Sequence, residues 1–175
     1  PEEYSAYTIE EILSSIGSEK NQEPEKKPNI IMVQLESFMD INLFSKLTFA
    51  TNPVPNFTRL KETCTSGKMY VPSVGAGTAN TEFEVLTGMN LDDFGTGEYP
   101  FKTVLQEKSC ESICYNLRAL GYACHGFHNN TGTFYSRHIA YKNLGFDTFT
   151  PLEYMSGYPI NPLGWAKDSC LTDQI

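Results

Sequence analysis

The sequence predicts an α/β fold in which a mostly parallel sheet is flanked by helices. Short apolar runs alternate along the chain with segments of helical spacing, and this order is typical of layered α/β domains. Polar residues suited to chemistry follow several of these runs, and such sheets hold their sites beyond the carboxyl ends of the strands. A folded core is expected, since 40% of the 175 residues are hydrophobic and 13% are aromatic.

Residues 1–28 differ from the rest of the chain and predict an acidic helical tether followed by a linker. The apolar residues of Tyr7–Ile16 have helical spacing, and Gly17 is a suitable stop. The polar stretch Ser18–Pro28 is typical of a linker. We therefore place the folded domain in residues 29–175 and assign no chemistry to the tether.

The elements of the domain follow from apolar periodicity and from glycine or proline breaks. Asn29–Leu35 is a nearly continuous apolar run, as expected for a strand buried on both faces, and it ends at the carboxylate of Glu36. The further predicted elements are a helix at Asn56–Cys64, a strand at Lys68–Val71, a helix from Thr78 or Ala79 to Leu86 with Gly88 near its end, a helix at Ser112–Leu120, a strand at Tyr122–Phe127 and a helix at Arg137–Leu144.

Charge and composition disfavour several classes of protein. The net charge of -8 argues against nucleic-acid binding, because that function needs cations for the phosphate backbone. No apolar stretch approaches the roughly 20 residues of a membrane helix. None of the five cysteines forms a CxxC pair, so we expect free, mostly buried thiols and no zinc site. The chain opens without Met or a signal-peptide pattern, and we take it to be a piece of a longer protein.

Glu36 and Thr78 form the first candidate pair. A carboxylate directly after an apolar strand can bind a divalent cation or cap a neighbouring turn. Thr78 follows a glycine-containing loop at a predicted helix start, where free N–H groups favour a phosphate or an alkoxide. A divalent ion shared with Glu36 would activate the Thr78 hydroxyl as a nucleophile. The alternative is that Thr78 is an ordinary N-cap.

A second group of candidates follows the strand predicted at Tyr122–Phe127. Arg137 offers a planar fork suited to phosphate oxygens. Tyr135 can pack against a substrate or hydrogen-bond it, and His128 can donate to a phosphoryl oxygen or to a leaving group. The alternative is that His128 and Tyr135 are half-buried structural residues and that Arg137 is a surface charge at a helix start.

Four segments carry a resemblance to a known family: Asn-Ile-Ile-Met-Val-Gln-Leu-Glu36-Ser-Phe, Gly-Ala-Gly-Thr78-Ala-Asn-Thr-Glu-Phe, Phe-His128-Asn-Asn and Phe-Tyr135-Ser-Arg137. Together they resemble the extracellular domain of lipoteichoic acid synthase-like phosphoglycerol transferases, in the sulfatase branch of the alkaline phosphatase superfamily. The likeness runs from about Asn29 to Asp168. It implies an alkaline phosphatase/sulfatase-like fold, of which this chain is the incomplete N-terminal part.

The resemblance also implies a reaction. Family members transfer glycerol phosphate from phosphatidylglycerol to a teichoic acid-type acceptor, and Thr78 would carry the phosphoglycerol-threonine intermediate. Glu36 and Thr78 would bind Mn²⁺ or Mg²⁺, and His128, Tyr135 and Arg137 would contact the phosphoglycerol head group. Relatives carry transmembrane helices before this domain. We therefore expect the extracellular face of a bacterial cell membrane, reached through a segment absent from this sequence.

The sequence departs from the family at the metal site. The family completes this site with an Asp-His pair and a further His, and no Asp-His dipeptide occurs here. We expect the chain alone to bind metal weakly or not at all, to be inactive, and to expose a sheet edge or an apolar face. The alternatives are another phosphodiesterase or phosphotransferase of the superfamily and a non-catalytic relative that binds the head group. A sulfatase reaction is disfavoured because Thr78 does not lie in a Cys/Ser-x-Pro-x-Arg sequence.

Overall fold

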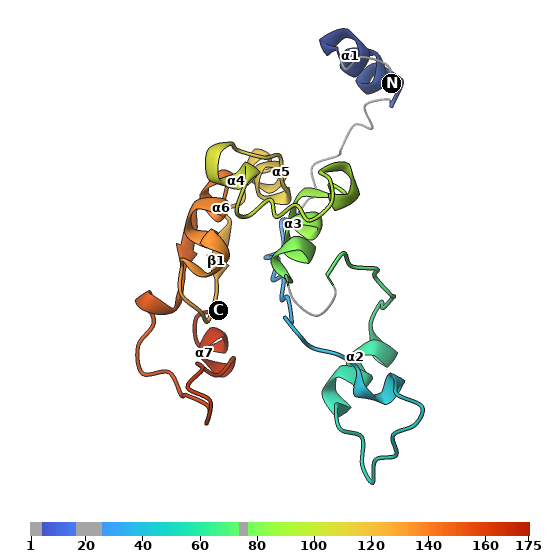
Figure 1. Cartoon of the computed structure of the whole chain (residues 1–175), viewed down its shortest axis with the longest axis vertical. Helices are drawn as coiled ribbons and strands as arrows, with labels where there is room; N and C mark the ends of the chain where they lie inside the picture. Colours follow the sequence, from blue (N-terminus) through green and yellow to red (C-terminus); the bar gives the residue numbers. More distant parts are fainter. Residues whose placement is uncertain (1–4, 17–25, 74–76) are drawn as a thin grey trace. The chain divides into compact units, whose positions relative to one another are not determined.

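The computed structural model describes residues 5–16, 26–73 and 77–175, and the chain divides into two units, residues 1–33 and 34–175 (Figure 1). Its α-helices, 3₁₀-helices (η) and strands are, in order, α1 Ala6–Ser15, η1 Ile41–Leu43, α2 Pro55–Thr63, α3 Ala79–Thr87, η2 Leu91–Asp93, α4 Val104–Glu107, α5 Ile113–Ala119, β1 His125–Phe127, η3 Phe134–Ser136, α6 Arg137–Asn143, β2 Thr148–Thr150, η4 Leu152–Tyr154 and α7 Ser169–Thr172. The predicted boundary between residues 28 and 29 stays a prediction. Gly17 and the start of the predicted linker lie outside the described residues.

The first unit contains α1, which confirms the helix predicted at Tyr7–Ile16. The side chain of Ser5 begins it by accepting a hydrogen bond from the Thr8 N–H at 3.1 Å. None of the residues of α1 is buried. Within the part of the chain that the structure describes, no helix is long and apolar enough to cross a membrane.

The second unit is built on a β–α–β arrangement. Strands β1 and β2 pair in parallel, with Gly126 opposite Phe149, and α6 lies between them in the sequence. A parallel pair needs such a crossover connection, because a tight turn cannot join the two strands. The α/β class is therefore confirmed, with a small parallel sheet flanked by helices. β1 confirms the carboxyl end of the strand predicted at Tyr122–Phe127, whereas β2 was not predicted.

Gly126 allows α6 to lie directly against β1. A β-carbon at this position would lie 2.7 Å from the ring of Tyr141 on α6, which is closer than side chains approach one another. The Tyr141 ring also stacks on Phe146, with centroids 4.3 Å apart, and meets Phe149 of β2 edge-on. The helix is thus held against the strands by aromatic packing that only glycine permits at position 126.

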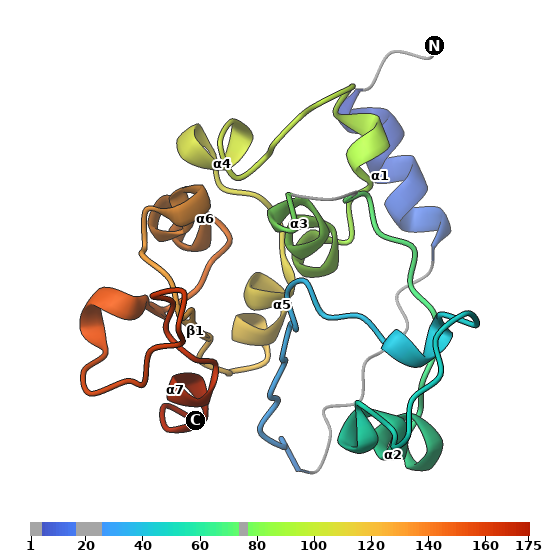
Figure 2. The same ribbon diagram turned by 60° about the horizontal axis from the view of Figure 1, so that its bottom comes forward.

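The core of the second unit lies between α3, α4 and α6 (Figure 2). Phe83 and Leu86 of α3 are buried as predicted, and Gly88 ends the helix with a φ of 71° and an N–H bond of 2.8 Å to the Glu84 carbonyl. The buried members of this core are Ala79, Phe83, Leu86, Leu91, Phe101, Leu105, Ala140, Tyr141 and Leu144. Helix α3 therefore carries an inward face whose position fixes the residues at its start.

The other predicted helices are also confirmed. Pro55 begins α2, where its missing N–H costs nothing. Ser112 caps α5 by accepting from the Cys114 N–H at 3.1 Å, and its hydroxyl donates to the Leu144 carbonyl at 2.5 Å, which joins α5 to the end of α6. All five cysteines are free, as expected, and three of them are buried.

Two predicted strands are wrong in this structure. Asn29–Leu35 and Lys68–Val71 have no strand pairing among the described residues, and their side chains are exposed, with Val33 at 65% and Tyr70 at 97%. A strand obtains its backbone hydrogen bonds from neighbouring strands, and the described ranges supply none beside these two segments. Both segments are apolar, as the sequence shows, but an apolar segment forms a strand only where another strand pairs with it.

Candidate active site

Glu36 and Thr78 meet although 42 positions separate them in the sequence. Glu36 lies in a turn directly after the apolar run, where Ser37 adopts a left-handed φ of 57°. Thr78 directly precedes α3. The Thr78 hydroxyl donates a hydrogen bond to Oε1 of Glu36. The structure thus brings the predicted nucleophile and the predicted metal-binding carboxylate into direct contact.

Thr78 does not act as an ordinary N-cap. An N-cap side chain accepts a bond from an N–H of the first helical turn, and Thr78 makes no such bond to α3. Its backbone is helical, with φ −58° and ψ −19°, and its hydroxyl is directed to Glu36 instead. The hydroxyl therefore lies at the positive end of α3, where the helix dipole favours an anion.

His128 is the third member of the cluster. Its backbone N–H bonds the Thr150 carbonyl at 3.2 Å just beyond the end of β1, and this places Nε2 3.9 Å from Oε2 of Glu36. The imidazole stacks on Phe134, with centroids 6.2 Å apart. Its Nδ1 is buried and has no hydrogen-bond partner within the described residues. His128 is therefore held by packing and retains one ring nitrogen for a further partner.

The surroundings of Glu36 keep its carboxyl ionised. The interaction with His128 lowers the pKa of Glu36 below its ordinary value, burial opposes this shift, and the positive charge of Arg137 adds to it. The side chain is 33% exposed, so the carboxylate remains accessible from solvent. An ionised, accessible carboxylate next to a hydroxyl can hold a cation or accept a proton.

Tyr135 is fixed in an unusual backbone conformation. Both Tyr135 and Ser136 have a φ of 55°, a left-handed geometry that costs free energy for residues other than glycine. The Tyr135 ring meets Phe134 edge-on at 4.6 Å, and the guanidinium of Arg137 lies 5.3 Å from its centroid. Packing on several sides thus holds a strained turn beside the cluster.

Arg137 lies beneath this turn and is not a surface charge at a helix start. Its side chain is 1% exposed, and Nη2 lies 2.7 Å from Oε2 of Glu82 on α3. Nε donates to the same oxygen at 3.2 Å, and Tyr141 donates to the other carboxylate oxygen at 2.5 Å. Burial disfavours the guanidinium charge, but Glu82 outweighs burial and raises the pKa of Arg137. The predicted contact of Arg137 with a phosphate stays a prediction, and here its fork holds Glu82.

Three residues beside the cluster were missed in the sequence. Glu82 lies one helical turn after Thr78, and this i, i+4 spacing was a usable signal for a shared helix face. Tyr141 completes the bonding of Glu82. Tyr99 reaches the cluster from a loop, with its ring stacked on that of Tyr135 at 5.8 Å, and no local pattern could have indicated this.

The cluster has oxygen donors that suit a hard divalent cation. The Glu36 carboxylate and the Thr78 hydroxyl adjoin one another, and such oxygens are the ligands that Mg²⁺ and Mn²⁺ prefer. The described residues contain no group of three or more His, Cys, Asp or Glu side chains that could hold a metal. The chemistry of the two donors therefore fits the predicted ion, and a full coordination shell needs further donors.

Two proteins of known name are similar to most of this chain. A candidate cyclic beta-1,2-glucan modification protein of Rhizobium meliloti (strain 1021) is 31% identical over 149 residues, which cover 85% of this chain and 22% of the relative. The capsular polysaccharide biosynthesis protein RkpI of the same organism is 29% identical over 155 residues, which cover 86% of this chain and 28% of the relative.

A solved structure and a family profile complete these comparisons. The crystal structure of the lipoteichoic acid synthase LtaP from Listeria monocytogenes has a TM-score of 0.52 and 22% identity, over 60% of this chain and 24% of that chain. At this identity the likeness shows the fold alone. This chain spans about a quarter of the length of these proteins. The profile of the sulfatase family matches residues 28–175, and the chain therefore belongs to the sulfatase family.

Proposed function

We propose that the protein containing this chain transfers glycerol phosphate from phosphatidylglycerol to a teichoic acid-type acceptor. The observation that carries the proposal is the hydrogen bond from the Thr78 hydroxyl to the ionised Glu36 at the start of α3. The sulfatase superfamily consists of enzymes that generally depend on a metal ion. A nucleophilic threonine beside a carboxylate is the arrangement that such an enzyme needs.

The first half-reaction forms an ester on Thr78. Thr78 Oγ attacks the phosphorus of phosphatidylglycerol, the new Oγ–P bond forms, and the bond from phosphorus to the diacylglycerol oxygen breaks. Glu36 orients the hydroxyl and accepts its hydrogen bond. Glu36 accepts the proton that Oγ loses. His128, whose Nε2 lies 3.9 Å from Oε2 of Glu36, gives a proton to the diacylglycerol oxygen as that oxygen leaves.

The second half-reaction reverses these roles. A hydroxyl of the acceptor attacks phosphorus, its new bond forms, and the Oγ–P bond breaks to return Thr78 to the free hydroxyl. Because Thr78 directly precedes α3, the positive end of the helix would stabilise the phosphoryl charge in both halves.

Glu36 and Thr78 would hold the divalent ion, Mn²⁺ or Mg²⁺. When bound, such an ion lowers the pKa of a hydroxyl and neutralises phosphoryl charge. His128 and Tyr135 would contact the head group directly, and Arg137 would present its positive charge from below Tyr135. The similar proteins include a capsular polysaccharide biosynthesis protein and a lipoteichoic acid synthase, which supports action on the extracellular face of a bacterial cell membrane.

A second acceptor class is favoured by one relative. The protein that is 31% identical to this chain is named for modification of a cyclic beta-1,2-glucan. The acceptor of the second half-reaction would then be a sugar hydroxyl of a glucan. The first half-reaction on Thr78 is the same for both acceptors, so a glucan and a teichoic acid compete for one intermediate.

Mass spectrometry of the full-length protein tests the proposal. After incubation with phosphatidylglycerol vesicles and Mn²⁺, we expect an added phosphoglycerol on the peptide that carries Thr78. Thr78→Ala should abolish the adduct, whereas Thr87→Ala at the end of the same helix should keep it, since the Thr87 hydroxyl bonds the Phe83 carbonyl within α3. Absence of the adduct from the wild-type protein would refute the proposal.

A further inference from the structure

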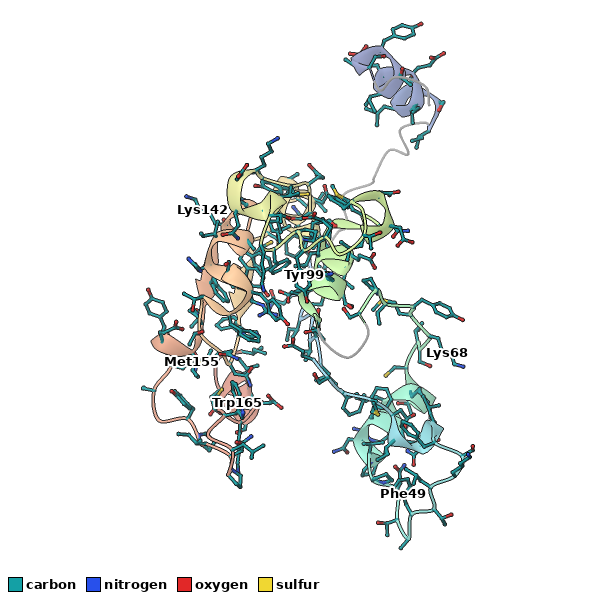
Figure 3. All side chains as sticks on the ribbon, viewed as in Figure 1. Phe49, Lys68, Tyr99, Lys142, Met155 and Trp165 are labelled. Atoms are coloured by element: carbon teal, nitrogen blue, oxygen red, sulfur yellow. The ribbon has the colours of Figure 1, made fainter. Side chains whose placement is uncertain are left out.

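Tyr99 lies beside the candidate site without a role in the chemistry proposed above. It comes from the loop between η2 and α4, and its ring stacks on that of Tyr135 with an interplanar angle of 11°. Its side chain packs against the core, and Figure 3 labels it beside α3. Nζ of Lys102 lies 5.2 Å from the centroids of both rings. The two stacked phenol rings therefore form one unit, which we call the tyrosine pair, and the Lys102 ammonium lies over it.

The hydroxyl of Tyr99 reaches the residue just before the proposed nucleophile. A β-carbon at Gly77 would overlap with the Tyr99 hydroxyl, so only glycine leaves room for it there. Gly77 is buried and has a φ of 85°. This close approach places a hydroxyl donor beside the backbone that leads into Thr78.

The Tyr99 hydroxyl stays protonated at this position. Burial raises its pKa, and a hydrogen bond with Tyr135 and the negative charge of Glu36 raise it further. A neutral phenol donates a hydrogen bond, so it suits an oxygen that carries negative charge.

Lys102 adds a positive charge on the side of the tyrosine pair. A cation over aromatic rings is attracted by their negative faces, which holds the ammonium near this place. The start of α3 contributes the partial positive charge of a helix N-terminus. An anionic oxygen next to Thr78 would therefore meet a donor and positive potential together.

We infer that Tyr99 is a further substrate-binding residue, whose hydroxyl donates a hydrogen bond to a non-bridging phosphoryl oxygen of the group that is transferred to Thr78. This inference rests on the proposed function and extends it to a residue outside the motifs. Tyr135 supports this contact by stacking on the Tyr99 ring. The tyrosine pair would thus contact the phosphate and not the glycerol.

The variant Tyr99→Phe tests the inference in the full-length protein. Phenylalanine keeps the ring stacked on Tyr135 and under Lys102, and it removes only the hydroxyl. We expect the second-order rate constant for adduct formation on Thr78 to fall about tenfold with phosphatidylglycerol, the loss typical of one hydrogen bond to a charged group. The same factor is expected with bis(p-nitrophenyl) phosphate, which contains a phosphodiester without glycerol.

The control is Tyr154→Phe, which removes the hydroxyl of a tyrosine that is 79% exposed and should leave both rates unchanged. Equal rates for wild type and Tyr99→Phe would overturn the inference. A loss with phosphatidylglycerol alone would also overturn it, because the hydroxyl would then bind glycerol. A lowered melting temperature with an unchanged rate per folded molecule would assign Tyr99 to folding. Failure of the wild type to form any adduct would refute the proposed function itself, which separates the two failures.

Discussion

The region around α3 and α6 and the two segments Asn29–Leu35 and Lys68–Val71 are similarly apolar, yet only the first is packed. Phe83 of α3 is fully buried, whereas Ile31 in the first segment is 64% exposed. A helix satisfies its backbone hydrogen bonds internally and needs only a surface to bury one face. A strand needs a second strand beside it before its side chains are covered. An apolar run predicted as a strand is therefore buried only where neighbouring strands pair with it, whereas a helix can be predicted from the local spacing of its apolar residues.

The largest expected effect comes from removing buried volume on each side of this comparison. Phe83→Ala should lower the free energy of unfolding of the chain by about 3–5 kcal/mol, because a large ring leaves a cavity in the core. Ile31→Ala should change it by less than about 0.5 kcal/mol, since its side chain is exposed. Urea titration followed by circular dichroism measures both. A large cost for Ile31→Ala would break the comparison by showing that this segment is covered.

The second effect concerns the buried ion pair that holds α3 against α6. Glu82→Gln removes the charge that neutralises Arg137, whose side chain is 1% exposed, and should cost about 3 kcal/mol of unfolding free energy. Glu62→Gln on the exposed side of α2 is the matched control and should cost almost nothing. Urea titration of the two variants checks the difference. Equal stabilities would mean that Arg137 finds another partner when Glu82 is neutral.

A third and smaller effect uses two glycines, Gly126 packed against α6 and Gly67 directly before the exposed segment Lys68–Val71. Gly126→Ala should lower stability by about 1–3 kcal/mol, because the added carbon would meet the Tyr141 ring at 2.7 Å and push α6 from β1. Gly67→Ala should be neutral, since nothing lies within 4 Å of a β-carbon there. Thermal melting monitored by circular dichroism compares the two variants. If the two glycine variants melted alike, α6 would not be pressed against the sheet.

The helices and much of the site could be predicted from the sequence because both depend on patterns among residues that are close in the sequence. Helical spacing and Gly88 defined α3, and residues at the ends of predicted elements identified Glu36, Thr78 and His128, which the structure brings together. Strand pairing joins residues distant in sequence, so β2 was missed and Asn29–Leu35 was given a pairing that the described residues lack.

The missed residues of the site have the same physical origin. Glu82 lies in the motif that contains Thr78, but its buried partner Arg137 is 55 positions away in the sequence. No local pattern indicates that two such distant residues form an ion pair. Tyr99 reaches Gly77 only through the fold. Local chemistry therefore indicated which residues could react, while tertiary packing decided which residues support them.

Glu36 sharpens the comparison because it follows the exposed run and yet binds Thr78 of the packed region. Its folded pKa lies below the ordinary value of 4.5, chiefly through its interaction with His128, so the ionised form is the one that stabilises the fold. That contribution is complete above about pH 4.5 and is lost as the pH falls through the lower folded pKa. The effect is the smallest of the four because solvent screens a side chain that is 33% exposed.

The stability difference between wild type and Glu36→Gln, measured by urea titration from pH 7 to pH 3, should therefore stay constant down to about pH 4.5 and shrink below it. Glu62→Gln removes a carboxylate remote from the site and accounts for the general effect of one charge. A difference between wild type and Glu36→Gln that grew on acidification would reverse the sign of the linkage. Glu36 would then be held in its neutral form, and a neutral acid could neither attract a cation nor accept the Thr78 proton.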